Sequence, residues 1–198
     1  EVNPQNPFER YADDIVIHCS SKEEAEQLLE KLKARMQQYE LELHPEKTKI
    51  VYCKNYQRND KHDNNSFTFL SYSFQPRTIK DKFGRTNRIV VFSPAISQMA
   101  KTNIRRVLRE VLMTRISHVK LEQFAERLNP KIRGWVNYYT KFNRMIGLDV
   151  FYYLNELIRQ WIKNTYKIRG KAWLYDKYRT IQSADPDMFY HWRLGIKA

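Results

Sequence analysis

The first half of the chain alternates short apolar stretches with polar tips, which is typical of strands and turns. Two such stretches surround the polar tip Tyr11-Ala12-Asp13-Asp14, so we predict a hairpin with both aspartates at its bend. The β-branched residues Ile15, Val16 and Ile17 favour a buried strand after the tip. Further strands are expected at 48–53, 67–75 and 88–92, with a loop at 54–66 and a long turn at 76–87 around 81–84.

One amphipathic helix is expected within this half. Ser21 and Glu24 have the spacing of a capping box, in which each side chain bonds the other residue's backbone N–H. Apolar residues then recur at helical spacing: Ala25, Leu28, Leu29, Leu32, Met36 and Tyr39.

From Ser93-Pro94 onward the pattern is helical. Ser is a favoured N-cap and Pro a favoured first helical residue, so we expect a helix to begin here. A second helix begins near Leu121, is interrupted at Asn129-Pro130 and resumes through Phe142, and a third begins near Asp149. The aromatic tail after Gly170 has no readable pattern. We therefore place two domains at 1–93 and 94–198.

The two halves of the chain differ in net charge. The 198 residues carry 35 Lys and Arg against 22 Asp and Glu, for a net charge of +13. Residues 1–94 have 15 basic and 14 acidic side chains, whereas residues 95–198 have 20 basic and 8 acidic ones. Aromatic residues alternate with the basic ones in the second half, which predicts binding to a polyanion. The alternative is a charged, solvated surface.

Composition excludes several classes of protein. A hydrophobic content of 42% is enough for a core. No apolar run approaches the roughly 18–20 residues that span a membrane, so no membrane partner is expected. The two cysteines, Cys19 and Cys53, are too few for a disulfide framework, and we expect free, half-buried thiols.

The adjacent aspartates Asp13 and Asp14 are the candidate metal ligands. Mg²⁺ prefers oxygen donors and binds through one or two carboxylates together with substrate phosphates. Two such ions held a few ångströms apart can stabilise both oxygens of a phosphoryl transfer. The alternative is an ordinary solvated turn, in which Asp bonds its own backbone.

These residues and three later blocks resemble the reverse transcriptases encoded by group II introns. Tyr11-Ala12-Asp13-Asp14 matches the catalytic box of the family's polymerase palm. Leu41 to Thr48 is similar to the following block, and Phe69-Leu70-Ser71-Tyr72 to the block that helps hold the primer. Leu128 to Tyr139 closely matches the maturase or thumb signature.

The resemblance implies RNA-templated DNA synthesis, in which Asp13 and Asp14 hold Mg²⁺ against the phosphates of the incoming dNTP. Tyr11 and Ala12 would contact the primer end or nucleotide, although Tyr11 could instead be a core residue. Lys47 corresponds to a position near the leaving pyrophosphate, where it could donate a proton or act by charge alone. Phe69, Leu70 and Ser71 would bind the primer.

The basic half is expected to contact nucleic-acid backbones, with a solvated surface as the alternative for each residue singly. We predict that Arg133, Asn137, Thr140, Lys141 and Arg144 share one helical face, with Ile132, Trp135, Val136 and Tyr139 packed in the core opposite. Gly134 allows either close packing, which we favour, or backbone approach. The main candidate contacts are Arg105, Arg109, Lys131, Arg133, Asn137, Lys141 and Arg144, and Arg106, Arg159 and Lys163 are further candidates.

The chain departs from the family pattern in two respects. Ser71 replaces the usual Gly, and the family needs a further catalytic carboxylate on a palm strand that would precede residue 1. We therefore expect the stretch 1–198 alone to be inactive and the full-length protein to polymerise.

Our overall expectation is an α+β chain: the C-terminal part of a palm at 1–93, then a helical thumb at 94–198. The expected function is reverse transcription with intron maturation. The expected partners are an RNA template, an RNA–DNA hybrid, dNTPs and group II intron RNA. The alternative function is a non-enzymatic RNA-binding splicing cofactor. We expect a bacterial cytoplasmic protein, with an organelle as the other possibility.

Overall fold

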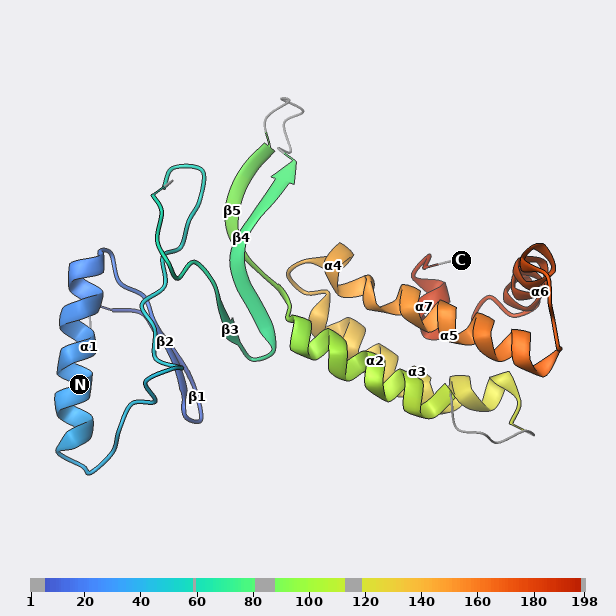
Figure 1. Cartoon of the computed structure of the whole chain (residues 1–198), viewed down its shortest axis with the longest axis horizontal. Helices are drawn as coiled ribbons and strands as arrows, with labels where there is room; N and C mark the ends of the chain where they lie inside the picture. The colour runs from blue at the N-terminus through green and yellow to red at the C-terminus, as the bar shows by residue number, and fades with distance from the viewer. Residues whose placement is uncertain (1–5, 59, 81–87, 113–118, 197–198) are drawn as a thin grey trace. The chain divides into compact units, whose positions relative to one another are not determined.

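The computed structural model describes residues 6–58, 60–80, 88–112 and 119–196, which fall into two compact units. Unit 1 comprises Glu1–Leu70 and Phe74–Ser93, and unit 2 comprises Ser71–Ser73 and Pro94–Ala198. Helices occur together with two small antiparallel sheets (Figure 1), which is compatible with the predicted α+β class.

The predicted hairpin in unit 1 is confirmed. Strand β1 (Phe8–Tyr11) pairs antiparallel with β2 (Asp14–Ile17), in a register that places Phe8 opposite Ile17 and Tyr11 opposite Asp14. The predicted burial is wrong, because Ile15 remains 46% exposed. A sheet of two strands has no inner strand to enclose such side chains.

Helix α1 (Lys22–Gln37) begins where the capping signal predicts. The Ser21 hydroxyl accepts a hydrogen bond from the Glu24 N–H at 3.1 Å. The reciprocal bond of a capping box is shifted by one residue, because the Glu24 carboxylate accepts from Ser20 N–H instead. The same carboxylate also accepts from the side chain of Asn6, which fixes the chain before β1 to the start of α1.

The second sheet differs from the sequence prediction. It contains β3 (Phe67–Phe69), β4 (Tyr72–Lys80) and β5 (Arg88–Ile96) in that order. The predicted strand 67–75 is therefore two strands joined by a turn, and β4 continues through part of the predicted turn 76–87. Residues 81–84 lie outside the described residues. No strand forms at 48–53, which is irregular.

The first helix of unit 2 begins later than predicted. Ser93 and Pro94 lie within β5, and helix α2 (Gln98–Leu112) starts after them. Ser97 is the capping residue, since its hydroxyl accepts from Ala100 N–H at 3.1 Å. Pro94 is tolerated in a strand because β5 is at the edge of its sheet, where a missing N–H need not break a ladder.

Unit 2 is a helical bundle with the main hydrophobic core. Its further helices are α3 (Leu121–Tyr139), α4 (Arg144–Leu148), α5 (Val150–Thr165), α6 (Lys171–Ala184) and α7 (Tyr190–Arg193). Helix α2 packs against both α3 and α5, as Figure 1 shows. Within the bundle, apolar side chains recur at helical spacing and are fully buried, including Leu108, Leu128 and Leu154.

Helix α3 continues through Pro130, so the predicted interruption is wrong. Proline removes one backbone hydrogen bond and costs about 3 kcal/mol within a helix. Leu128 and Ile132 on either side of it are fully buried, and each such burial contributes roughly 1.5–3 kcal/mol. The neighbouring Asn129 side chain donates to Met188 O and accepts from Tyr190 N–H, both at 2.8 Å, and so fixes the later chain to α3.

A buried polar centre joins α5, α6 and α7. The Asn155 Oδ1 atom is within 2.8 Å of the Tyr178 hydroxyl, 2.7 Å of His191 Nε2 and 3.1 Å of Trp192 Nε1. Burial lowers the pKa of His191 to about 3, so the ring is neutral. A neutral ring with its hydrogen on Nε2 makes all three groups donors to one amide oxygen.

None of the helices in the described part of the chain is long and apolar enough to cross a membrane. Both cysteines are free thiols. Cys19 is half-buried as expected, whereas Cys53 is exposed.

Candidate nucleic-acid and metal-binding sites

The turn between β1 and β2 presents the aspartate pair. Ala12 and Asp13 form the two-residue turn, and Asp14 is the first residue of β2. Ala12 has a φ of 53°, in the left-handed region that L-residues adopt at some cost. The Arg10 side chain donates from Nε to the Ala12 carbonyl at 3.0 Å, which supports this backbone conformation.

The donor chemistry of this turn fits Mg²⁺, but the ligand set is small. Asp13 and Asp14 are both exposed and supply carboxylate oxygens, the donors that Mg²⁺ prefers. Among the described residues, no group of three His, Cys, Asp or Glu side chains comes together to hold a metal ion. The turn can therefore contribute two carboxylates to a site that needs other ligands.

Two other residues that were predicted to act together with the aspartates, Tyr11 and Lys47, are also exposed. Tyr11, directly before the turn, is 63% exposed, so the alternative of a core tyrosine is wrong. Lys47 lies in the exposed turn 45–47, whose backbone is held by Lys47 and Thr48 N–H groups donating to His44 O. Both side chains are accessible to a ligand.

The block 69–71 comprises Phe69, the last residue of β3, and the two-residue turn Leu70-Ser71 that leads into β4. Leu70 and Ser71 have φ values of 49° and 65°, the combination that type I′ hairpin turns require and that strongly favours Gly at the second position. The positive φ at this position explains why the family usually has Gly where this chain has Ser71. Phe69 is half-buried, whereas Leu70 is exposed.

Tyr72, the last residue of the block that was associated with the primer, packs among aromatic side chains of unit 2. It is only 5% exposed and its ring lies 5.1–5.7 Å from those of Tyr138, Tyr139 and Phe142. Its hydroxyl donates to the Tyr138 carbonyl oxygen, and burial raises the pKa of Tyr72 to about 12. No local pattern could indicate this, since the partners are about 66 residues apart.

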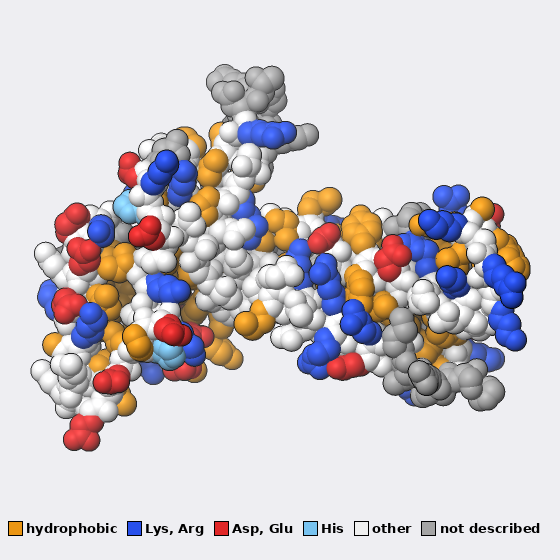
Figure 2. All heavy atoms as spheres, viewed as in Figure 1, with side chains coloured by type: hydrophobic (Ala, Val, Ile, Leu, Met, Phe, Trp, Pro, Cys, Tyr) orange, Lys and Arg blue, Asp and Glu red, His pale blue; other side chains and the backbone are white. Residues whose placement is uncertain are grey.

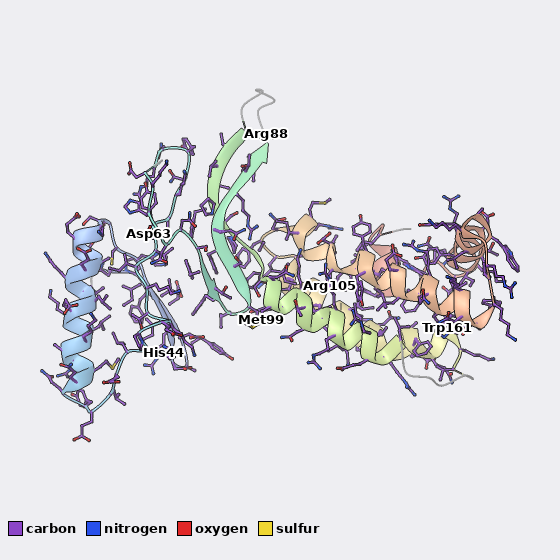
Figure 3. All side chains as sticks on the ribbon, viewed as in Figure 1. His44, Asp63, Arg88, Met99, Arg105 and Trp161 are labelled. Carbon is purple, nitrogen blue, oxygen red and sulfur yellow. The ribbon has the colours of Figure 1, made fainter. Side chains whose placement is uncertain are left out.

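The α2 arginines are engaged with α5 (Figure 3 labels Arg105). Arg109 donates from Nε to the Tyr153 hydroxyl at 3.0 Å, and the guanidinium groups of Arg105 and Arg109 lie 5.8 and 5.9 Å from the Tyr153 ring centre. Both side chains keep their positive charge but also stabilise the packing of α2 against α5. A phosphate bound by either arginine would therefore compete with its contact to Tyr153.

The α3 face differs from the predicted one because the helix ends at Tyr139. Ile132 and Val136 are buried and Trp135 and Tyr139 packed against the core, as predicted. Arg133 and Asn137 are exposed on α3, while Lys141 and Arg144 are exposed beyond its end and so do not share its face. Arg133 lies over the Tyr190 ring, 5.5 Å from its centre.

A different exposed stripe runs along α3. Arg127, Lys131, Gly134 and Tyr138 follow one another at spacings of three or four residues, which places them on one side of the helix. A Cβ added at Gly134 would meet nothing within 4 Å, so the expected close packing at this glycine is wrong. Of this stripe, only Lys131 was predicted as a contact. The i, i+3, i+4 spacing of the other residues is the sequence signal that could have identified them.

Comparison with known proteins identifies two domains in one chain. The family model of the reverse transcriptases (RNA-dependent DNA polymerases) matches residues 1–74. The model of the group II intron maturase-specific domain matches residues 101–179. No curated protein matches the chain. Because both models match in this order, the chain belongs to the group II intron-encoded reverse transcriptases and maturases.

Proposed function

We propose that residues 1–93 contribute the C-terminal part of a polymerase palm and that residues 94–198 form a thumb that binds RNA. The observation that carries the polymerase assignment is the exposed Asp13-Asp14 pair where the β1–β2 turn leads into β2, within the segment matched by the reverse transcriptase model. The exposed cations of α3 support the second part, within the segment matched by the maturase model.

In this proposal Asp13 and Asp14 bind Mg²⁺ together with a carboxylate from outside residues 1–198. Bound Mg²⁺ would neutralise the phosphate charge that develops during nucleotide transfer. Tyr11, Ala12 and the turn Phe69 to Ser71 contact the primer and the incoming dNTP. Lys47 stabilises the leaving pyrophosphate, through its charge or by donating a proton.

The α3 stripe of Arg127, Lys131, Gly134 and Tyr138 is proposed to follow the backbone of RNA or of an RNA–DNA hybrid. These duplexes are A-like, and proteins recognise them through shape, phosphates and 2′-hydroxyls. A helix face with two cations, Arg127 and Lys131, followed by a position without a side chain suits such a surface, because Gly134 lets a phosphate backbone approach closely.

Primer extension by the full-length protein on an RNA template tests the polymerase assignment. Asp13→Asn and Asp14→Asn should each reduce the rate by at least about 100-fold, because carboxylate ligands supply several kcal/mol of transition-state stabilisation through the metal. Asp63→Asn, which changes an exposed aspartate elsewhere in unit 1, is the matched control and should leave the rate unchanged.

A second candidate function is a non-enzymatic splicing cofactor. It is favoured by the observation that the described residues bring no third metal-ligating side chain to the aspartates. If the full-length wild-type protein binds intron RNA but never extends a primer with Mg²⁺ and dNTPs, the cofactor assignment replaces the polymerase assignment.

Metal binding can be tested without activity. Mn²⁺ added to the chain should broaden the backbone NMR signals of residues around the β1–β2 turn, and the Asp13→Asn, Asp14→Asn double variant should abolish that broadening. Broadening elsewhere, with none at the turn, would contradict the assignment of these two ligands.

A further inference from the structure

A second basic surface lies where α5 ends and α6 begins. Residues 163–179 contain six basic side chains and a single acidic one, Asp176. None of the six forms an ion pair within the described part of the chain. Figure 2 shows Lys and Arg side chains gathered over α6. The basic residues are Lys163, Lys167, Arg169, Lys171, Lys177 and Arg179.

Three large aromatic side chains of residues 163–179 are exposed and lie outside the buried core: Tyr166, Trp173 and Tyr175, the last of which lies under the guanidinium group of Arg159. Trp173 is 59% exposed and Tyr166 is 45% exposed. Lys177 Nζ lies 4.6 Å from the centre of the Tyr166 ring, and Trp173 precedes Lys177 by four residues on the same side of α6. Since Tyr178 on α6 is fully buried, the helix keeps its core contacts with other residues.

The turn between the helices keeps a lysine where glycine is preferred. Lys167 has a φ of 51°, and Ile168 N–H donates to Lys163 O at 3.0 Å, which is the long bond of a Schellman motif. Ile168 is buried, so the turn is firmly anchored. A non-glycine residue in the left-handed region is destabilising, and here the residue that occupies it adds another exposed cation.

We propose that Tyr166, Lys167, Trp173 and Lys177, hereafter the α5–α6 platform, bind unpaired nucleotides of RNA. The lysines contact phosphates and the exposed indole of Trp173 stacks on a base. This rests on the proposed RNA-binding function of unit 2 but names a second contact, on other elements than the α3 stripe.

The chemistry favours a single strand over a duplex. Bases within a duplex are stacked on one another and show only their edges, whereas unpaired bases expose the faces on which aromatic side chains stack. Phosphate contact alone would need cations but no exposed indole. The near absence of acidic side chains from 163–179 makes the platform complementary to a polyanion.

Fluorescence anisotropy with the full 198-residue chain tests this proposal. Two probes are used: a labelled single-stranded oligouridylate of about 12 nucleotides and a labelled, blunt-ended RNA duplex. Trp173→Ala should weaken binding of the single strand by about tenfold and change the affinity for the duplex by less than twofold. Tyr39→Ala, at an exposed tyrosine of unit 1, is the matched control and should have no effect.

Lys167→Gly provides a test that misfolding cannot imitate. Glycine relieves the backbone strain, so the melting temperature of the chain should rise, while loss of the cation should weaken binding of the single strand about threefold or more. Lys167→Arg keeps the charge and should bind the single strand as the wild type does.

Three results would overturn the proposal. One is unchanged affinity of Trp173→Ala for the single strand, and another is an equal loss for the duplex, which would indicate a surface for phosphates alone. The third is competition by polyglutamate as strong as that by RNA, which would indicate an acidic protein partner. Because binding to short probes is measured directly, failure here differs from failure of primer extension or of the α3 contacts.

Discussion

Gly147 of α4 lies against the backbone carbonyl of Tyr139 at the end of α3. A Cβ built on Gly147 would stand 2.6 Å from the Tyr139 oxygen and 3.1 Å from the Thr140 methyl group. This approach is closer than any ordinary carbon–oxygen contact. The tight connection between α3 and α4, which follows the maturase signature, therefore requires a residue without a side chain.

We expect Gly147→Ala to destabilise unit 2 by roughly 1–3 kcal/mol, the usual effect of overpacking where backbone must move. Urea unfolding followed by circular dichroism measures this. Equal stability of the variant and the wild type would mean that α4 can shift away from α3 without loss.

Gly134→Ala should stabilise unit 2, whereas Gly147→Ala should destabilise it. The added methyl group meets nothing within 4 Å, and Ala is favoured over Gly in a helix by about 1 kcal/mol. The variant should therefore melt at a higher temperature but bind duplex RNA more weakly, because the Cβ holds the phosphate backbone away from α3. A gain in stability with unchanged duplex affinity would remove Gly134 from the proposed contact.

Ser71→Gly should stabilise the turn between β3 and β4 by about 0.5–1 kcal/mol. Ser71 has a φ of 65°, which glycine adopts without a steric penalty. Ser73→Gly is the matched control in the following strand, where glycine should destabilise. Thermal unfolding of both variants gives the comparison, and two shifts of the same sign would contradict the backbone explanation.

Stability should fall as the solution is made acidic, through His191. Its folded-state pKa of about 3 lies below the ordinary value of 6.5, so the unfolded chain binds the proton more readily. The contribution is fully present above pH 6.5 and is lost as the pH falls toward 3, with a slope of up to about 1.4 kcal/mol per pH unit. His191→Phe, measured by urea unfolding between pH 7 and 4, should flatten this dependence; an unchanged slope would assign it to other groups.

Local signals predicted much of the fold. The hairpin at Tyr11 to Asp14, the start of α1 at Ser21 and the apolar stripes of the helices depend on residues near one another in the sequence. The wrong predictions are those that tertiary contacts decide. Pro130 lies inside α3 because its buried neighbours outweigh its local penalty, and Pro94 lies in an edge strand rather than at a helix start.

The candidate sites also fall into those that local sequence predicts and those that depend on the folded structure. Asp13 and Asp14 were located by their local pattern, and the structure leaves both exposed at the turn. The α3 face was misassigned because the sequence did not indicate that the helix ends at Tyr139. Tyr166, Lys167 and Trp173 were not identified, since their role depends on a left-handed turn and on exposure, neither of which periodicity reveals.

The Asn155 side-chain oxygen accepts hydrogen bonds from Tyr178, His191 and Trp192, and these partners determine how much of the chain the helical bundle needs in order to fold. The segment that the maturase model recognises ends at residue 179, yet Phe189, His191, Trp192 and Ile196 from beyond it fill the bundle's interior. A recombinant fragment that ends at residue 179 would expose that interior to water. The Asn155 oxygen would also lose two of its three hydrogen-bond donors, His191 and Trp192. The smallest piece able to fold by itself is thus longer than the sequence signature by which the domain is recognised.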